Sequence, residues 1–562
     1  MWGIACVATA NVLQLAQPQV LRFAVDDLYR GVTAAKLGRY AFLLFGIALA
    51  AGVFKYFMRQ SVIAISRHLE FDLRTELFAH LQRQPLAWFQ RHRIGGIMSV
   101  ATNDMAAVRM MLGPGVMYTV NTLTVGVVSM AFMLAISPRL TLLSLLPLPL
   151  VSASVWYFGN RIHARFENVQ ARFAALSAHV QENLAGLRVV RAFAAEPPQT
   201  AHFEALSEDY RERNLELIRI AGVFQPSLAL FSGVGALLAL WIGGREAIAG
   251  RITLGQFVAF TWYLGMLNWP MIALGWVINL FQRGAASYGR IAALLDAEPE
   301  IADAPGAVPP AAGRGELEFR HLTFTYPGAA EPALRDVSFR VPAGATVALV
   351  GRTGAGKSTL LALLPRLFDP PPGTVFVDGR DVRALELAGL RARLATVPQD
   401  PFLFSATVAE NVAYGVAGAD DAAIRRAAGV ARLDPDVRGF PDGYATPVGE
   451  RGVTLSGGQR QRAAIARAVL RDAPVLLLDD CLSSVDTQTE EAILQGLRAE
   501  MRRRTTLIVS HRVSTVRDAD LILVLERGAI VERGGHAELL ALGGRYAALH
   551  RAQQLEEEIA AS

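Results

Sequence analysis

Six long stretches of the chain are nearly free of charged side chains, and they constrain its fold more than any other feature. Five contain no Asp, Glu, Lys or Arg: residues 1–21, 110–138, 140–160, 220–244 and 252–282. The sixth, residues 40–66, is interrupted only by Lys55 and Arg59. About 20 mostly apolar residues carry a helix across the hydrocarbon of a bilayer. We therefore expect a six-helix transmembrane domain over residues 1–295.

The connections between these stretches are unequal in length. Residues 67–109 and 161–219 are long, rich in arginine, and repeat apolar residues at three- and four-residue intervals, which predicts helices that continue beyond the bilayer. Basic loops favour the cytoplasmic side. An even number of spans also returns the chain to the side where it began, so we place both long connections and everything after residue 295 in the cytoplasm.

Two features of the membrane part each allow a second interpretation. Residues 1–21 could be read as a signal peptide, but they lack a basic start and a small-residue cleavage site, so we interpret them as the first span. Lys55 and Arg59 lie one turn apart on the same face of the second helix. They either face a water-filled cavity or extend toward lipid headgroups.

Beyond the membrane part the composition changes. Residues 296–313 contain four prolines and no periodic pattern, which predicts a linker. Residues 314–562 alternate strand-like and helical segments, which predicts an α/β domain. The net charge of +5 is small for 562 residues and gives no reason to expect a nucleic-acid partner. Two cysteines, Cys6 and Cys481, exclude a disulfide framework.

The strand-like run ATVALV leads directly into GRTGAGKST, residues 351–359, and a helical segment follows. This is a complete phosphate-binding loop in its required context. Gly354 and Gly356 allow backbone N–H groups to converge on phosphate oxygens, Lys357 supplies a positive charge, and Ser358 offers a hydroxyl to Mg²⁺. The motif predicts ATP and Mg²⁺ as ligands.

A second acidic element follows the apolar run VLLL at residues 475–478, which ends in Asp479 and Asp480. Ligands of open α/β sheets bind at the carboxyl ends of the strands. Together with the phosphate-binding loop, this position makes Asp479 the expected Mg²⁺ carboxylate.

Between these elements lies LSGGQRQR, Leu455 to Arg462. With this motif the chain resembles the ATP-binding cassette (ABC) transporters, and six spans, two long cytoplasmic arms and one nucleotide-binding domain resemble an exporter-type half-transporter. The resemblance covers nearly the whole chain. It implies a multi-pass protein of the bacterial inner membrane that hydrolyses ATP to drive transport.

The resemblance also assigns roles. Tyr326 resembles the aromatic residue that stacks on adenine, Gln399 the residue that links Mg²⁺ to the arms, and His511 the γ-phosphate contact. Val448–Gly452 resembles the element that touches the partner's arms, and Ser483–Asp486 the loop that crosses the dimer interface. The expected nucleotide-binding residues are Tyr326, Gly351, Thr353, Gly354, Ala355, Gly356, Lys357, Ser358, Thr359, Ser456, Gly457, Gly458 and Gln459; the expected Mg²⁺ ligands are Ser358, Gln399 and Asp479; the expected catalytic residues are Asp480, His511 and Gln399.

One position departs from the family pattern. Most catalytically competent members have Glu directly after the Mg²⁺ aspartate, where this chain has Asp480. In the family, each ATP lies between the phosphate-binding loop of one subunit and the signature of the other, so a single copy cannot complete a site. A shortened carboxylate beside an intact signature resembles the degenerate half of heterodimeric bacterial multidrug exporters. The alternatives are a slow homodimer, including a homodimeric flippase for lipid or lipid-linked cargo, and an ATP-gated regulatory or channel-like membrane protein.

The sequence gives little information about the molecule that is transported. The last span carries aromatic and amide residues that suit an amphipathic, drug-like cargo if they face a cavity, and that otherwise serve as interfacial anchors or packing. These residues are Trp262, Tyr263, Asn268, Trp269, Trp276 and Asn279. Residues 87–96 and 195–206 of the arms are expected to dock on nucleotide-binding domains, or else to be plain amphipathic helix.

Overall fold

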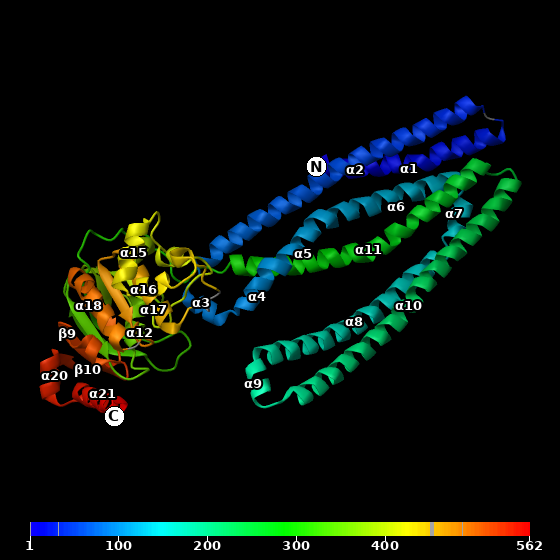
Figure 1. The fold of residues 1–562 in the computed structure, drawn as a ribbon. Helices are drawn as coiled ribbons and strands as arrows, with labels where there is room; N and C mark the ends of the chain where they lie inside the picture. The colour runs from blue at the N-terminus through cyan, green and yellow to red at the C-terminus, as the bar shows by residue number, and fades with distance from the viewer. Residues whose placement is uncertain (1, 32, 450–454, 486, 562) are drawn as a thin grey trace. The chain divides into compact units, whose positions relative to one another are not determined.

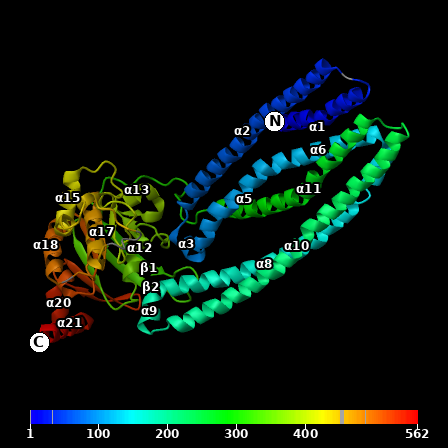
Figure 2. The ribbon, with the colours of Figure 1, turned by 45° about the vertical axis from the view of Figure 1, so that its right-hand side comes forward.

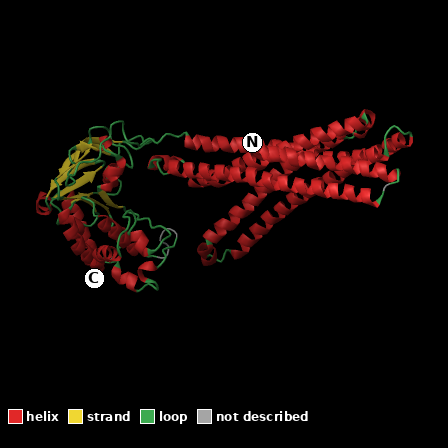
Figure 3. Cartoon of the chain, turned by 90° about the horizontal axis from the view of Figure 1, so that it is seen from above, coloured by secondary structure: helices red, strands yellow, loops and turns green. Residues whose placement is uncertain are grey.

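The computed structural model describes residues 2–31, 33–449, 455–485 and 487–561. It divides into two compact units. Unit 1 holds residues 1–79 and 95–297, and unit 2 holds residues 80–94 and 298–562. The described strands all belong to unit 2, whereas the described part of unit 1 is helical (Figure 3).

The described residues form six helical rods, lying almost entirely in unit 1, that are long and apolar enough to cross a membrane, as the sequence predicted. Four of the predicted spans lie in rods Trp2–Tyr29 (α1), Ala34–Leu81 (α2), Glu196–Ile248 (α10) and Leu254–Leu295 (α11). The third rod comprises α4 (Ile94–Ser99), the π-helical η1 (Val100–Asp104), α5 (Met105–Met110), the π-helical η2 (Met111–Gly115) and α6 (Val116–Ile136). The fourth comprises α7 (Pro138–Ser144) and α8 (Leu148–Ala185).

Both long connections are helical, as their periodicity predicted. Helix α8 and helix α10 lie side by side as a long antiparallel pair, and α9 (Leu187–Ala192) forms the turn between them (Figures 1 and 2). The ion pair between Arg172 and Asp209, at 3.1 Å, joins the two helices along this pair.

The start of helix α11 is fixed by local chemistry. The Thr253 hydroxyl accepts a hydrogen bond from the Gln256 backbone at 3.1 Å, and the Gln256 side chain accepts one from the Thr253 backbone at 2.8 Å. This reciprocal capping satisfies two backbone donors that the helix itself leaves unpaired. Asp26 of α1 accepts further bonds from Thr253 and from the Gly255 N–H, so α1 and α11 are joined at this end.

Two residues with open interpretations have defined contacts. Tyr263 is fully buried, and its hydroxyl donates to the carbonyl of Leu15 at 2.8 Å, so it packs within unit 1. The Lys55 ammonium donates to the side-chain oxygen of Gln14 on α1 at 2.8 Å. That hydrogen bond gives the Lys55 cation a polar partner on a neighbouring helix.

Unit 2 is built on two sheets. The first has the order β2-β1-β4-β5 and is antiparallel; its strands are β1 (Leu317–Phe324), β2 (Leu334–Val341), β4 (Val375–Val377) and β5 (Arg380–Asp381). The second has the order β10-β9-β3-β8-β7-β6; its strands are β3 (Thr346–Val350), β6 (Leu394–Val397), β7 (Val475–Asp479), β8 (Thr505–Val509), β9 (Leu521–Glu526) and β10 (Ala529–Gly534). All pairs in the second sheet are parallel except β9–β10. Strands β3 and β8 are buried along their whole length, which agrees with the apolar residues that follow the threonines at their starts.

Helices surround these sheets. They are α12 (Lys357–Leu363), η3 (Val382–Ala384), α13 (Leu387–Ala392), α14 (Val408–Val412), α15 (Asp421–Val430), α16 (Asp434–Arg438), η4 (Gly443–Ala445), α17 (Gly457–Arg471), α18 (Thr487–Arg503), α19 (Val513–Val516), α20 (His536–Leu542) and α21 (Arg545–Ala561). The alternation of strands and helices confirms the predicted α/β class of this unit.

Helix α3 (Leu86–Arg91) comes from the first long connection but belongs to unit 2. Ala87 is buried in the same apolar cluster as residues of β1 and β2. Arg91 forms an ion pair with Glu300. One of the two arm elements expected to dock on a nucleotide-binding domain therefore packs on the domain of its own chain.

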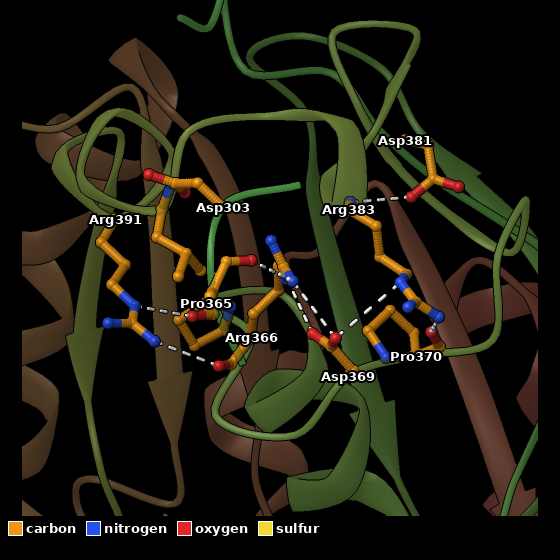
Figure 4. A network of polar contacts seen from close by, with 10 residues as sticks. Asp303, Pro365, Arg366, Asp369, Pro370, Asp381, Arg383 and Arg391 are labelled. Carbon is orange, nitrogen blue, oxygen red and sulfur yellow. Dashed lines mark hydrogen bonds and ion pairs between the residues drawn. The ribbon is translucent and has the colours of Figure 1, made fainter. Parts of the chain in front are cut away.

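Within the proline-rich segment 296–313, residues 298–313 belong to unit 2 and form a strap bound along it. The Ala302 carbonyl accepts from Arg366 at 3.3 Å, and Asp303 accepts from the Leu387 N–H at 2.7 Å. Farther on, Val308 pairs with Leu385 as a parallel bridge. Arg366 is itself held by Asp369 through two hydrogen bonds of 2.7 and 3.1 Å (Figure 4). No periodic pattern in the sequence indicated this bridge.

Candidate nucleotide-binding site

The phosphate-binding loop, residues 351–356, follows strand β3 and precedes α12. Gly351 has φ +150°, and a Cβ built there would come within 2.2 Å of the Leu525 carbonyl oxygen. Gly356 has φ +99°, and a Cβ there would lie 2.7 Å from the Leu334 side chain and 2.8 Å from the Ala333 carbonyl oxygen. Glycine at these two positions is therefore required by both conformation and space.

Lys357 lies across this loop. Its ammonium donates to the carbonyl oxygens of Gly351 at 2.7 Å and Arg352 at 3.0 Å. Burial lowers the pKa of Lys357, while Asp480 and Asp479 act in the opposite direction. The ammonium is therefore held inside the loop, at the position where a phosphate would be cradled.

Ser358 and Asp479 meet at the end of strand β7. The Ser358 hydroxyl donates to Asp479 Oδ1 at 3.0 Å. Burial raises the pKa of Asp479, and the hydrogen bond from Ser358 partly opposes this rise. A half-buried carboxylate beside a hydroxyl is a set of hard oxygen donors that fits a magnesium ion.

Asp480 is the next residue and is held rigidly. Its φ of +44° is in the left-handed region, its N–H donates to the Val509 carbonyl at 2.9 Å, and it is 8% exposed. Its Oδ2 lies 3.8 Å from Nε2 of His511, which follows strand β8. Because β3, β7 and β8 are parallel neighbours, the sheet brings their carboxyl ends to one edge.

Tyr326 approaches from the end of the antiparallel sheet. Its hydroxyl donates to the Thr359 side chain at 3.0 Å, and its ring packs edge-on against Phe324 and Phe368. The ring therefore stands beside the phosphate-binding loop, where the sequence placed an adenine contact.

One cavity of about 350 Å³ collects most of the predicted residues. Its lining includes Tyr326, Thr353, Gly354, Ala355, Gly356, Lys357, Ser358, Thr359, Gln399, Asp479, Asp480 and His511. Gly351 lies outside this lining and contributes through the Lys357 contact.

The signature residues are placed elsewhere. Ser456 caps helix α17, accepting from the Gln459 N–H at 3.2 Å, while the Gln459 side chain accepts from the Ser456 N–H at 2.9 Å. A separate cavity of about 440 Å³ contains Gly457 and also Gln399. A Cβ on Gly458 would lie 3.1 Å from the Ser484 carbonyl oxygen, so glycine permits close packing there. Among the described residues, the cavity with the phosphate-binding loop holds no signature residue.

Part of the predicted interface loop can be followed. Ser483 and Ser484 are both bound by Gln461, whose amide donates to Ser483 at 3.1 Å and accepts from the Ser484 N–H at 3.0 Å. Sequence reasoning missed Gln461, although it lies inside the signature motif two residues after Gln459. Val448 is buried, whereas residues 450–452 and Asp486 of the predicted elements lie outside the described residues.

Comparisons with known proteins agree with this arrangement. Residues 1–271 match the ABC transporter transmembrane region, and residues 334–483 match the ABC transporter family. The chain is 39% identical to the multidrug resistance-like ATP-binding protein MdlA of Escherichia coli over 99% of this chain and 94% of that protein. It is 33% identical to an ATP-dependent lipid A-core flippase of Syntrophus aciditrophicus over 99% and 92% of the two chains.

A solved structure resembles the whole chain. This is the structure of a bacterial Atm1-family ABC exporter with ATP bound, with a TM-score of 0.79 and 30% identity over 98% of this chain and 97% of that one. Both units thus have counterparts in a single exporter polypeptide. The chain therefore belongs to the ABC transporters, as an exporter-type half-transporter of the inner membrane whose cytoplasmic domain binds ATP and couples its hydrolysis to export.

Proposed function

We propose that this chain is the low-turnover subunit of a heterodimeric exporter for amphipathic, drug-like molecules. The observation that carries the proposal is Asp480. Aspartate is one methylene shorter than the glutamate of competent family members, so its carboxylate falls about 1.5 Å short of the attacking water. Misplacement on that scale costs on the order of a hundredfold in rate.

The surroundings of Asp480 support this inference. Its backbone is fixed by the hydrogen bond to Val509, and its side chain is confined at 8% exposure beside His511. These contacts oppose a shift of the backbone that would replace the missing methylene.

The remaining residues retain what nucleotide binding requires. Tyr326 stacks on the adenine, backbone N–H groups of the loop and Lys357 hold the phosphates, and His511 contacts the γ-phosphate. Ser358, Asp479 and Gln399 would hold Mg²⁺, which neutralises charge that develops on the phosphates during transfer. We expect ATP binding at this site to be intact and hydrolysis to be slow.

The partner follows from the separation of the two half-sites. Because the described signature residues lie in a different cavity from the phosphate-binding loop, a second half-transporter must supply the complementary half. Residues Ser456–Gly458 of this chain would in turn complete the partner's site. With a glutamate in that partner, one site of the pair would hydrolyse ATP efficiently.

The cargo is inferred from unit 1. A cavity of about 280 Å³ between α7, α8, α10 and α11 combines apolar walls with the polar residues Ser144, Ser232, Thr261 and Asn268. An apolar cavity with a few polar groups suits an amphipathic molecule. A homodimeric lipid flippase is the second candidate, favoured by the similarity to proteins named as lipid A-core flippases.

The test is ATP turnover by the purified full chain in lipid nanodiscs, without a second subunit. We expect slow turnover, a large increase for Asp480→Glu, and unchanged ATP affinity in both proteins. Brisk turnover by the chain alone that disappears in Asp480→Asn contradicts the heterodimer and supports a homodimer.

A further inference from the structure

The loop after strand β8 carries His511, and its backbone has few partners inside the sheet. Ser510 N–H reaches the Leu349 carbonyl at 3.4 Å, and Arg512 N–H donates to the Ser510 hydroxyl at 3.0 Å. The carbonyl of His511 and the N–H of Val513 point out of the sheet toward helix α21. The His511 carbonyl belongs to the peptide group that adjoins the His511 Cα, so its orientation bears directly on the direction of the imidazole; the Val513 N–H belongs to the next peptide group along the chain.

Gln553, in the middle of helix α21, binds both groups. Its side-chain oxygen accepts from the Val513 N–H at 2.8 Å, and its side-chain nitrogen donates to the His511 carbonyl. One carboxamide therefore bridges the backbone on either side of Arg512. Two simultaneous hydrogen bonds fix the position and the rotation of that backbone segment.

The same loop is also held by Glu490 of helix α18, which is 2% exposed. Glu490 accepts hydrogen bonds from the Arg512 guanidinium, from Ser514 at 3.2 Å and from Thr515 at 2.9 Å. The hydrogen bonds of Glu490 are to side chains of the loop, whereas those of Gln553 are to its backbone. Helix α21 therefore binds the backbone on both sides of Arg512, in addition to the Ser510 hydroxyl, which accepts from the Arg512 N–H.

We propose that Gln553 is a positioning residue for His511 and makes the C-terminal helix part of the hydrolytic machinery. The inference rests on the proposed contact of His511 with the γ-phosphate. Without the carboxamide, the peptide groups flanking Arg512 can rotate. The imidazole of His511 is then no longer held in one orientation toward the nucleotide. The rate of hydrolysis falls while the ATP-binding residues stay in place.

The chain offers a matched control, because Gln554 is the next residue of the same helix and is exposed. The full chain in nanodiscs, in excess over radiolabelled ATP, gives a single-turnover rate even when hydrolysis is slow. We expect Gln553→Ala to reduce this rate by on the order of tenfold with ATP affinity within about twofold of wild type. Gln554→Ala keeps the wild-type rate.

A second variant sharpens the test. In Gln553→Glu the carboxylate still accepts from Val513 but repels the His511 carbonyl, so we expect a rate as low as that of Gln553→Ala. Hydrogen exchange at the Val513 amide reports the lost clamp directly and accelerates in Gln553→Ala. A wild-type rate in Gln553→Ala overturns the inference, as does a loss of rate accompanied by equal losses of ATP affinity and thermal stability.

The variant His511→Ala distinguishes a failure of this inference from a failure of the proposed contact between His511 and the γ-phosphate. A wild-type rate in His511→Ala removes the role of His511 itself. If His511→Ala lowers the single-turnover rate and Gln553→Ala keeps the wild-type rate, the role of His511 is retained and only the role of Gln553 is rejected.

Discussion

The hydroxyl of Ser358 donates a 3.0 Å hydrogen bond to Asp479, which joins the end of the phosphate-binding loop to the end of strand β7. The pairing leaves two oxygen donors side by side in the nucleotide cavity. It also explains why two motifs far apart in the sequence act as one site.

The first prediction concerns magnesium. Asp479→Asn removes the anionic oxygen that would bind the ion, so we expect ATP affinity in the presence of Mg²⁺ to fall by roughly tenfold or more. Chelating Mg²⁺ with EDTA should weaken ATP binding in the wild type and have little further effect in the variant. Fluorescent ATP titration of the full chain measures both. The exposed Asp421→Asn is the control, and an equal response to EDTA in Asp479→Asn contradicts the assignment.

The second prediction concerns Gly356. Gly356→Ala places a Cβ against Leu334 and Ala333 at a φ of +99°, so we expect a loss of about 1–3 kcal/mol of stability and impaired ATP binding. Gly429 lies in helix α15, and a Cβ added there would meet no atom within 4 Å. Gly429→Ala should be neutral or stabilise by up to about 1 kcal/mol. Thermal unfolding compares the two, and equal behaviour would rule out the steric explanation.

The third prediction concerns Gln461, which is 2% exposed and binds Ser483 and the Ser484 backbone. Gln461→Ala removes both hydrogen bonds, and because Ser483 and Ser484 are exposed and water can take Gln461's place, we expect a loss of only about 0.5–1.5 kcal/mol of stability. Because the loop they belong to resembles the family's interface loop, we expect lower ATP turnover in the assembled dimer as well. Gln488→Ala, at an exposed position in α18, should leave both quantities unchanged.

The fourth prediction concerns acid. Burial, followed by the neighbouring His550, lowers the pKa of His536, whose ring bonds the Tyr546 hydroxyl at 2.7 Å. His536 therefore binds a proton more readily in the unfolded chain than in the folded one. The free energy of unfolding is accordingly higher above the ordinary pKa of 6.5 and decreases as the pH falls through that value. The unfolding temperature of His536→Gln should depend less on pH between about 7.5 and 5.5. The exposed His68→Gln should retain the wild-type slope, and an unchanged slope in His536→Gln rejects this origin.

The sequence predicted the elements whose signal is local. Long apolar runs, five of them without a charged residue, predicted the six spans, and the strand-loop-helix context of Gly351–Thr359 located the phosphate-binding loop. Contacts between distant segments carried no such signal. Neither the bond of Gln553 to the His511 loop nor the bond of Asp26 to Gly255 follows from spacing, because each depends on how separate helices pack. The pairing of Val308 with Leu385 could not be predicted, because a single backbone bridge requires no particular pattern of side chains.

The polypeptide passes between the two units three times, at residues 79–80, 94–95 and 297–298. Helix α11 ends at Leu295, and Glu300, five residues later, already forms an ion pair with Arg91 of unit 2; five residues reach no more than about 18 Å when fully extended. Helix α2 runs across the first crossing and α4 across the second, so three continuous covalent connections join the ATP-binding unit to the second, third and sixth membrane helices. Mechanical work in this exporter does not need to rely on non-covalent docking alone.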